Sequence, residues 1–143
     1  MGRKPSNRES LRYKARVGYE GEYSLLRKFV DTGEAGYYAV RTPGSGSGKM
    51  PKPDIIAVDR GELMAIEVKS SGKDYAMLSR EQVQRLLEFV NRFEVCCPHC
   101  KNRFNPRPIA AVRFIGRGWR FVDVSSLDGR GLVVRWEDDG HGS

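Results

Sequence analysis

The chain lacks any long apolar run. None of its 143 residues belongs to a stretch approaching the roughly 18 apolar residues that a bilayer-spanning helix requires. The first residues, Met1 to Ser6, also lack the apolar segment of a signal peptide. No segment repeats along the chain. We therefore expect a cytoplasmic protein with no membrane association and, at 39% hydrophobic content, a single domain with one core.

Cysteine and histidine are scarce, and all but one of them lie in one short segment. The chain has 3 Cys and 2 His, and Cys97 and Cys100 have the spacing of half a zinc site. One zinc could hardly take four ligands from so compact a run, so a structural zinc would require a second chain. It would brace the loop after the second helix and take no part in chemistry. Reduced buried thiols and, in a thermophile, a local disulfide are the alternatives.

Positive charge is abundant and unevenly distributed. The formal net charge is +7 and the pI is about 9.5, which suits an anionic partner such as nucleic acid, although a solvated basic surface has the same composition. Residues 3–16 carry one acid, Glu9, among six basic side chains. We expect residues 1–15 to form a flexible basic arm that binds phosphates, or else a disordered tail without a role. Residues 137–143 are expected to be a frayed acidic tail.

Apolar periodicity predicts an α/β domain over residues 16–136, with a central mixed β-sheet flanked by helices. A first helix is expected over residues 17–30 with an apolar stripe of Leu25, Leu26 and Phe29. A second helix should open at Ser79 with a capping box and end near Phe93. Strands are expected at 37–41, on both sides of a turn at 59–62, at 109–115 and 119–124, with 132–136 as a further candidate. Residues 94–108 are expected to be a cysteine-rich insertion.

The turn at 59–62 predicts a hairpin that brings two acids together. If the hairpin is centred between Arg60 and Gly61, Asp54 lies directly opposite Glu67, with Cβ atoms roughly 4.5–5.5 Å apart. Lys69 lies on the same face because side chains alternate along a strand. Like charges at that distance destabilise a sheet unless something compensates, and a bound cation is the simplest compensation. Apolar residues on both sides of the hairpin imply a sheet centre that is covered on both faces.

Glu22 lies on the apolar stripe of the first helix, so its carboxylate should point to the interior. A buried acid needs a partner. The alternatives are that Glu22 lies at the helix edge and extends to solvent, or that it pairs with an arginine. Taken one at a time, Asp54, Glu67 and Lys69 could be surface charges on an edge hairpin. Taken together with Glu22, they are three acids and a lysine in a hydrophobic setting, which is costly without a metal. Carboxylates and waters are the ligands that magnesium prefers, and manganese also fits. Arg41 would contact a phosphate or is a surface arginine.

The sequence resembles a known family at these residues. Pro53-Asp54 with Glu67-Val68-Lys69 resembles the PD-(D/E)xK nuclease motif. The surrounding frame is similar to the archaeal-type Holliday junction resolvases over residues 13–93. It consists of Arg16-Val17-Gly18, Glu22 with Leu25, Gly36 to Arg41, Pro43-Gly44-Ser45-Gly46, Pro53 to Ala57 and Ile66 to Ser70.

The resemblance implies a restriction-endonuclease-like fold and a homodimer that binds four-way DNA junctions. Such enzymes nick two opposing strands symmetrically, using magnesium. The resemblance assigns metal binding to Glu22, Asp54 and Glu67, and catalysis to Lys69. It assigns a phosphate contact to Arg41 and the serine of a mobile loop to Ser45 or Ser47.

This sequence departs from the family pattern at Tyr23, at 96–108 and in the long arm at 3–12. Two other functions stay open. One is a nuclease of the same fold that cuts other branched or duplex DNA, and the other is a basic DNA-binding module without activity.

Overall fold

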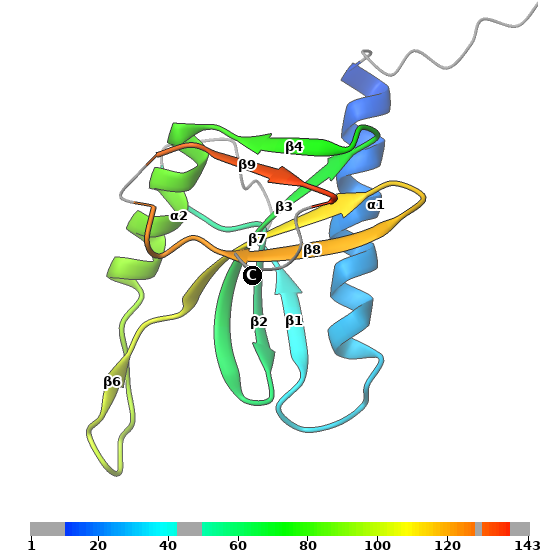
Figure 1. Ribbon diagram of the computed structural model, residues 1–143. Helices are drawn as coiled ribbons and strands as arrows, with labels where there is room; N and C mark the ends of the chain where they lie inside the picture. Colours follow the sequence, from blue (N-terminus) through cyan, green and yellow to red (C-terminus); the bar gives the residue numbers. More distant parts are fainter. Residues whose placement is uncertain (1–10, 43–49, 128–129, 138–143) are drawn as a thin grey trace, which may run out of the picture.

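A mixed five-stranded sheet with a helix on each face is the centre of the domain (Figure 1). The computed structural model describes residues 11–42, 50–127 and 130–137, with side chains described from Arg16 onward. The elements are α1 (Leu11–Val30), β1 (Tyr38–Arg41), β2 (Ile55–Asp59), β3 (Glu62–Ser71), β4 (Tyr75–Leu78), α2 (Arg80–Arg92), β5 (Val95–Cys96), β6 (Arg103–Phe104), β7 (Arg107–Phe114), β8 (Gly118–Asp123) and β9 (Leu132–Arg135). The predicted α/β fold class is confirmed.

The strand order in the main sheet is β1-β2-β3-β7-β8. Neighbouring strands run antiparallel except β3 and β7, which pair in parallel from Met64 with Arg107 to Ser71 with Phe114. A parallel pair needs a long crossover connection, and the connection here contains β4, α2 and the small hairpin β5–β6. Strands β4 and β9 form a separate antiparallel pair.

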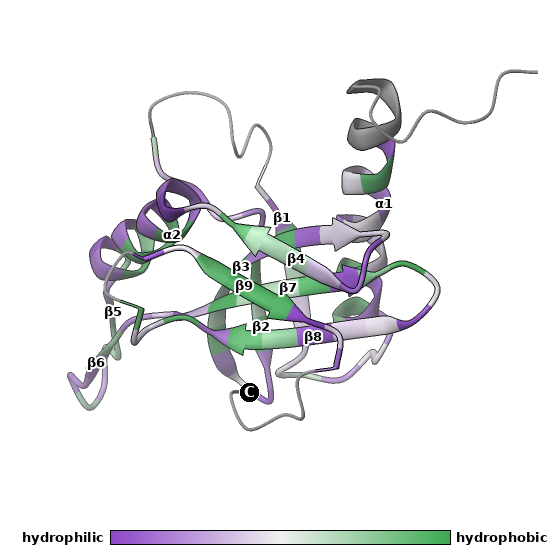
Figure 2. Cartoon of the chain, turned by 45° about the horizontal axis from the view of Figure 1, so that its top comes forward, coloured by the Kyte–Doolittle hydropathy of each residue, from purple (hydrophilic) through white to green (hydrophobic). Residues whose placement is uncertain are grey.

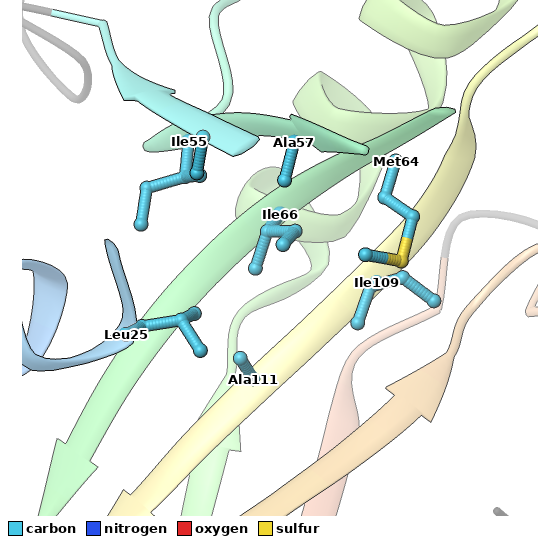
Figure 3. Packing of buried hydrophobic residues seen from close by; sticks show 8 residues of the cluster. Leu25, Ile55, Ala57, Met64, Ile66, Ile109 and Ala111 are labelled. Atoms are coloured by element: carbon cyan, nitrogen blue, oxygen red, sulfur yellow. The ribbon is translucent and has the colours of Figure 1, made fainter. Parts of the chain in front are cut away.

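Each face of the sheet is covered by one helix. On one side Leu25 of α1 packs against Ile55, Ala57, Met64, Ile66, Ile109 and Ala111 of the sheet (Figure 3). On the other side α2 packs on Ala65 and Ala110. These residues alternate along β3 and β7 with those that face α1, because successive side chains of a strand point to opposite faces. Ile66 and Ala65 both have 0% exposed surface, so the prediction of a sheet centre covered on both sides is confirmed. The outward side of α2 is hydrophilic (Figure 2).

The hairpin β2–β3 has the predicted register. The pairing runs from Ile55 with Ile66 to Asp59 with Glu62, and both turn residues have positive φ, 52° at Arg60 and 79° at Gly61. Positive φ at both central residues is the turn geometry that matches strand twist. The ladder stops at Ile55, because the Asp54 amide donates to the Ile66 carbonyl at 3.0 Å, one residue out of register. Asp54 therefore lies just beyond the paired strand, and the prediction that it is paired directly opposite Glu67 is wrong by one residue.

Helix α2 confirms the predicted capping box. The Ser79 hydroxyl accepts from the Gln82 amide at 3.1 Å, and the Ser79 amide donates to the Gln82 side chain at 2.8 Å. Helix α1 differs from the prediction, because it begins at Leu11 and takes in residues 11–15 of the expected arm. Those residues include Leu, Arg, Lys and Ala and no Gly or Pro, so helix propensity extends the helix beyond its apolar stripe.

Three short strands were not predicted: β4, β5 and β6. Two are only two residues long, too short for alternation to be recognised. Neither helix in the described ranges is long and apolar enough to cross a membrane.

Candidate active site

Asp54 is buried and fixed by the strands on both sides of it. The residue is only 7% exposed. One of its carboxylate oxygens accepts a hydrogen bond from the Val68 amide of β3 at 2.8 Å. Its carbonyl accepts from the Thr42 amide at 3.0 Å, and the Thr42 hydroxyl donates to the Pro53 carbonyl. Thr42 therefore ties the end of β1 to the site, a role that no feature of the sequence signalled.

Glu67 lies beside Asp54 in an environment that opposes its ionisation. Burial, followed by the charge of Asp54 and a hydrogen bond with it, raises the pKa of Glu67 to about 9, although the Lys69 ammonium acts in the opposite direction. Two carboxyls this close resist sharing two negative charges. The predicted meeting of Asp54 and Glu67 is therefore present, with Lys69 within electrostatic reach.

Two of these groups, Glu67 and Lys69, lie on the face of β3 opposite to Val68. Val68 packs into the cluster beneath α1, so the alternation along β3 directs Glu67 and Lys69 to the opposite face. The site thus lies at the end of β2, where pairing with β3 stops.

Glu22 is the partner of Arg41. The Arg41 Nε donates to a Glu22 carboxylate oxygen at 2.9 Å, and the two side chains are 34% and 18% exposed. The Arg41 guanidinium also lies over the Tyr19 ring, 5.1 Å from its centroid. Burial, with the Asp54 charge adding to it, raises the pKa of Glu22, and the Arg41 contact partly offsets this. The alternative prediction, in which Glu22 pairs with an arginine, is therefore confirmed.

The structure does not gather Glu22, Asp54 and Glu67 into a single ligand group. Within the described ranges no three His, Cys, Asp or Glu side chains are placed to hold one metal ion. Asp54 and Glu67 are together, and Glu22 acts on them through its charge. The two close carboxyls fit a hard divalent cation, because a cation would relieve the repulsion that raises the pKa of Glu67. Glu22 thus affects this pair of carboxyls through its charge, while its own side chain is paired with Arg41. Ser45 and Ser47 lie outside the described residues.

One further pair of residues sets the position of the helix acid. A Cβ at Gly21 would lie 2.5 Å from the Ser70 hydroxyl oxygen, so α1 approaches β3 closely at the residue before Glu22. The Ser70 hydroxyl oxygen is buried and has no hydrogen-bond partner in the described part of the chain. A glycine inside a helical pattern is the signal that could have revealed this contact.

The cysteine segment forms the hairpin β5–β6. All three cysteines are free, and Cys96 and Cys100 are exposed, so the alternative of buried thiols is wrong. Zinc at Cys97 and Cys100 stays a prediction.

Comparison with known proteins identifies the family. The sequence model of the archaeal Holliday junction resolvases (Hjc) matches residues 13–137. The chain belongs to this family. Its relatives are named crossover junction endodeoxyribonucleases, which supports the predicted function of an endonuclease that acts on Holliday junctions.

Two archaeal relatives illustrate the extent of the similarity within the resolvase family. The crossover junction endodeoxyribonuclease Hje of Saccharolobus islandicus is 35% identical over 98 residues, which are 68% of this chain and 64% of the relative. The Hjc of Archaeoglobus fulgidus is 30% identical over 99 residues, 69% of this chain and 65% of the relative. The chain thus matches slightly less than two thirds of each.

A solved structure has the same fold. The structure of Archaeoglobus fulgidus Hjc, a Holliday junction resolvase, superimposes with a TM-score of 0.59 at 25% identity, covering 82% of this chain and 83% of that one. The predicted family resemblance is confirmed.

Proposed function

We propose that this family member is a magnesium-dependent endonuclease that nicks paired strands of four-way DNA junctions. The observation that carries the proposal is the meeting of Asp54 and Glu67, one buried and the other with its pKa raised to about 9. Two carboxyls in such a place destabilise the metal-free protein. Their presence beside Lys69 is accounted for if they hold a cation during phosphodiester hydrolysis.

The side chains have separate tasks in this proposal. Asp54, Glu67 and the Val68 carbonyl would hold magnesium, which when bound supplies charge stabilisation at the scissile phosphate and a more acidic attacking water. Lys69 orients that water or stabilises the charge that develops on the phosphate. Glu22 would help to hold the cation through a bridging water molecule. Arg41, which lies beside Glu22, contacts a phosphate of the DNA. Manganese would substitute, because it accepts the same oxygen ligands.

Paired incision of a two-fold symmetric junction requires two sites at a fixed separation, so we propose a homodimer. The net charge of +7 supplies the sequence-independent attraction to phosphates. A cytoplasmic location stays a prediction.

Cleavage of a synthetic four-way junction beside a linear duplex of the same sequence tests the proposal. Asp54→Asn should lower magnesium-dependent nicking by more than about a hundredfold while junction binding persists. Asp59→Asn is the matched control, because Asp59 is exposed at the other end of the same strand.

Each adverse result has a distinct meaning. Preference for the linear duplex would show a nuclease of the same fold with another substrate. Binding without nicking by the unaltered protein would show a DNA-binding module, and unchanged nicking by Asp54→Asn would refute the assigned site.

A further inference from the structure

The hairpin β5–β6 is a built element that the nuclease site does not use. It projects beyond the end of α2, away from the sheet (Figures 1 and 2). Its strands pair Val95 with Phe104 and Cys96 with Arg103. The Asn105 side chain donates to the Val90 carbonyl at 2.8 Å and so anchors the base of the hairpin to α2. The tip is therefore held at a defined place outside the body of the domain.

Two thiols share the tip of this hairpin. The Cys97 amide donates to the Asn102 carbonyl at 2.8 Å, and the Lys101 amide donates to the Cys97 carbonyl at 2.9 Å. These two bonds close a tight turn that carries Cys97 and Cys100. The Cys100 amide, the His99 amide and the Cys100 thiol surround the Cys97 sulfur within hydrogen-bonding reach. The two cysteine side chains of the turn therefore lie side by side.

Backbone conformation is unfavourable at the end of the turn. Lys101 has a φ of 64°, in the left-handed region that residues other than glycine rarely adopt. This conformation turns the chain back toward Cys97, where the Asn102 carbonyl accepts from the Cys97 amide. Strain of this kind persists where the surrounding structure imposes it, and it is concentrated at functional sites.

We propose that the Cys97–Cys100 turn binds zinc, and that the turn of a second copy of this chain supplies the other two ligands. Four thiolates in a tetrahedral arrangement form a structural zinc site, with Zn–S distances of about 2.3 Å. Each cysteine that binds as a thiol releases its proton to solvent. This zinc site is separate from the nuclease function and does not depend on it.

A second copy is needed because this chain offers two ligands at the turn. In the described ranges no third Cys, His, Asp or Glu completes a set with Cys97 and Cys100. The Cys96 thiol is turned to the Cys97 carbonyl, 3.6 Å away. Because the tip projects and Cys100 is exposed, two tips can meet about a two-fold axis, as symmetric interfaces between identical chains do.

Metal titration of the full-length, reduced protein tests this inference. After removal of metals by a chelator, we expect saturation by zinc at one ion per two chains. Cobalt(II) in place of zinc should give a tetrahedral spectrum whose thiolate charge-transfer intensity corresponds to four Co–S bonds. Saturation at one ion per chain, a spectrum with two Co–S bonds, or no binding would overturn the proposal.

Variants assign the ligands. Cys97→Ser and Cys100→Ser should each lower zinc affinity by more than about a hundredfold, while the control Cys96→Ser retains it. His141, which lies outside the described residues, provides a second control. Loss of zinc in His141→Ala, or retention in Cys97→Ser, would overturn the assignment. Asp54→Asn should bind zinc with unchanged stoichiometry, so failure of the zinc site and failure of the nuclease proposal are separately observable.

Discussion

Two hairpins of this protein carry pairs of side chains that we propose as metal ligands, and the two pairs differ in their surroundings. The β2–β3 hairpin lies inside the main sheet, with apolar residues covered on both faces, and brings together Asp54 and Glu67. The β5–β6 hairpin pairs with no other strand in the described ranges and carries exposed cysteines. Burial makes the carboxyl pair costly and rigid, whereas exposure leaves the thiol pair free to meet a partner.

The largest expected difference is in stability. Ile66→Ala removes a fully buried side chain from β3 and should lower the free energy of unfolding by about 2–5 kcal/mol, because a cavity remains. Val95→Ala, the matched change in β5, should cost less than about 1 kcal/mol, since Val95 is only partly buried. Denaturant unfolding of both variants measures the difference, and similar losses would contradict the comparison.

The next effect concerns activity. Glu67→Gln removes one of the two carboxylates of the candidate site and should reduce junction nicking by about a hundredfold or more. Glu94→Gln, at the base of the cysteine hairpin, should leave the nicking rate unchanged, because Glu94 forms an exposed ion pair with Arg103. Single-turnover rates on a four-way junction provide the measurement. Equal reductions in the two variants would place catalysis outside the carboxyl pair.

The two hairpins should also respond to pH in opposite directions. Folding raises the pKa of Glu67 from 4.5 to about 9, so between these values the folded state binds the extra proton. The stability of the metal-free protein should therefore fall as pH rises through this window. Folding lowers the pKa of Cys97 from 9.0, so that thiol should add stability as pH rises towards 9.0.

Unfolding free energies of the metal-free protein across this pH range check both signs. Glu67→Gln should make the free energy of unfolding decrease less steeply with rising pH, and Cys97→Ser should make it decrease more steeply. No change of slope in Glu67→Gln would show that Glu67 ionises normally in the folded protein.

The smallest effects are expected at the two turns. Gly61 has a φ of 79°, so Gly61→Ala should lower the free energy of unfolding by about 1 kcal/mol through backbone strain. No steric clash adds to this cost, because a Cβ there meets no other atom within 4 Å. Lys101→Gly should raise stability by about 0.5 kcal/mol or less, because relief of strain exceeds the entropy that glycine loses. Thermal unfolding of the two variants should shift in opposite directions.

The main sheet and the acidic pair could be predicted because their signals are strong. Alternating apolar residues around the turn at Arg60 and Gly61 fixed the register that places Asp54 near Glu67. The capping box at Ser79 fixed the start of α2. Both signals are local, so tertiary packing did not need to be known.

Other parts of the site depend on contacts between distant segments. The choice of Arg41 as the partner of Glu22 required the position of β1 relative to α1. The close approach of Gly21 to Ser70 and the Thr42 contacts arise from packing between separate elements. The strands β5 and β6 are too short to produce a periodic pattern.

The hydrogen bond from the Val68 amide to Asp54 spans only 14 positions in the sequence. Bringing such residues together requires closure of one short loop, whereas pairing β3 with β7 must close a chain of about three times that length. Folding order should follow this difference, because local contacts form before distant ones. The two carboxyls are thus brought together by a segment that can form early, and the later arrival of β7 and α2 encloses a pair that already exists.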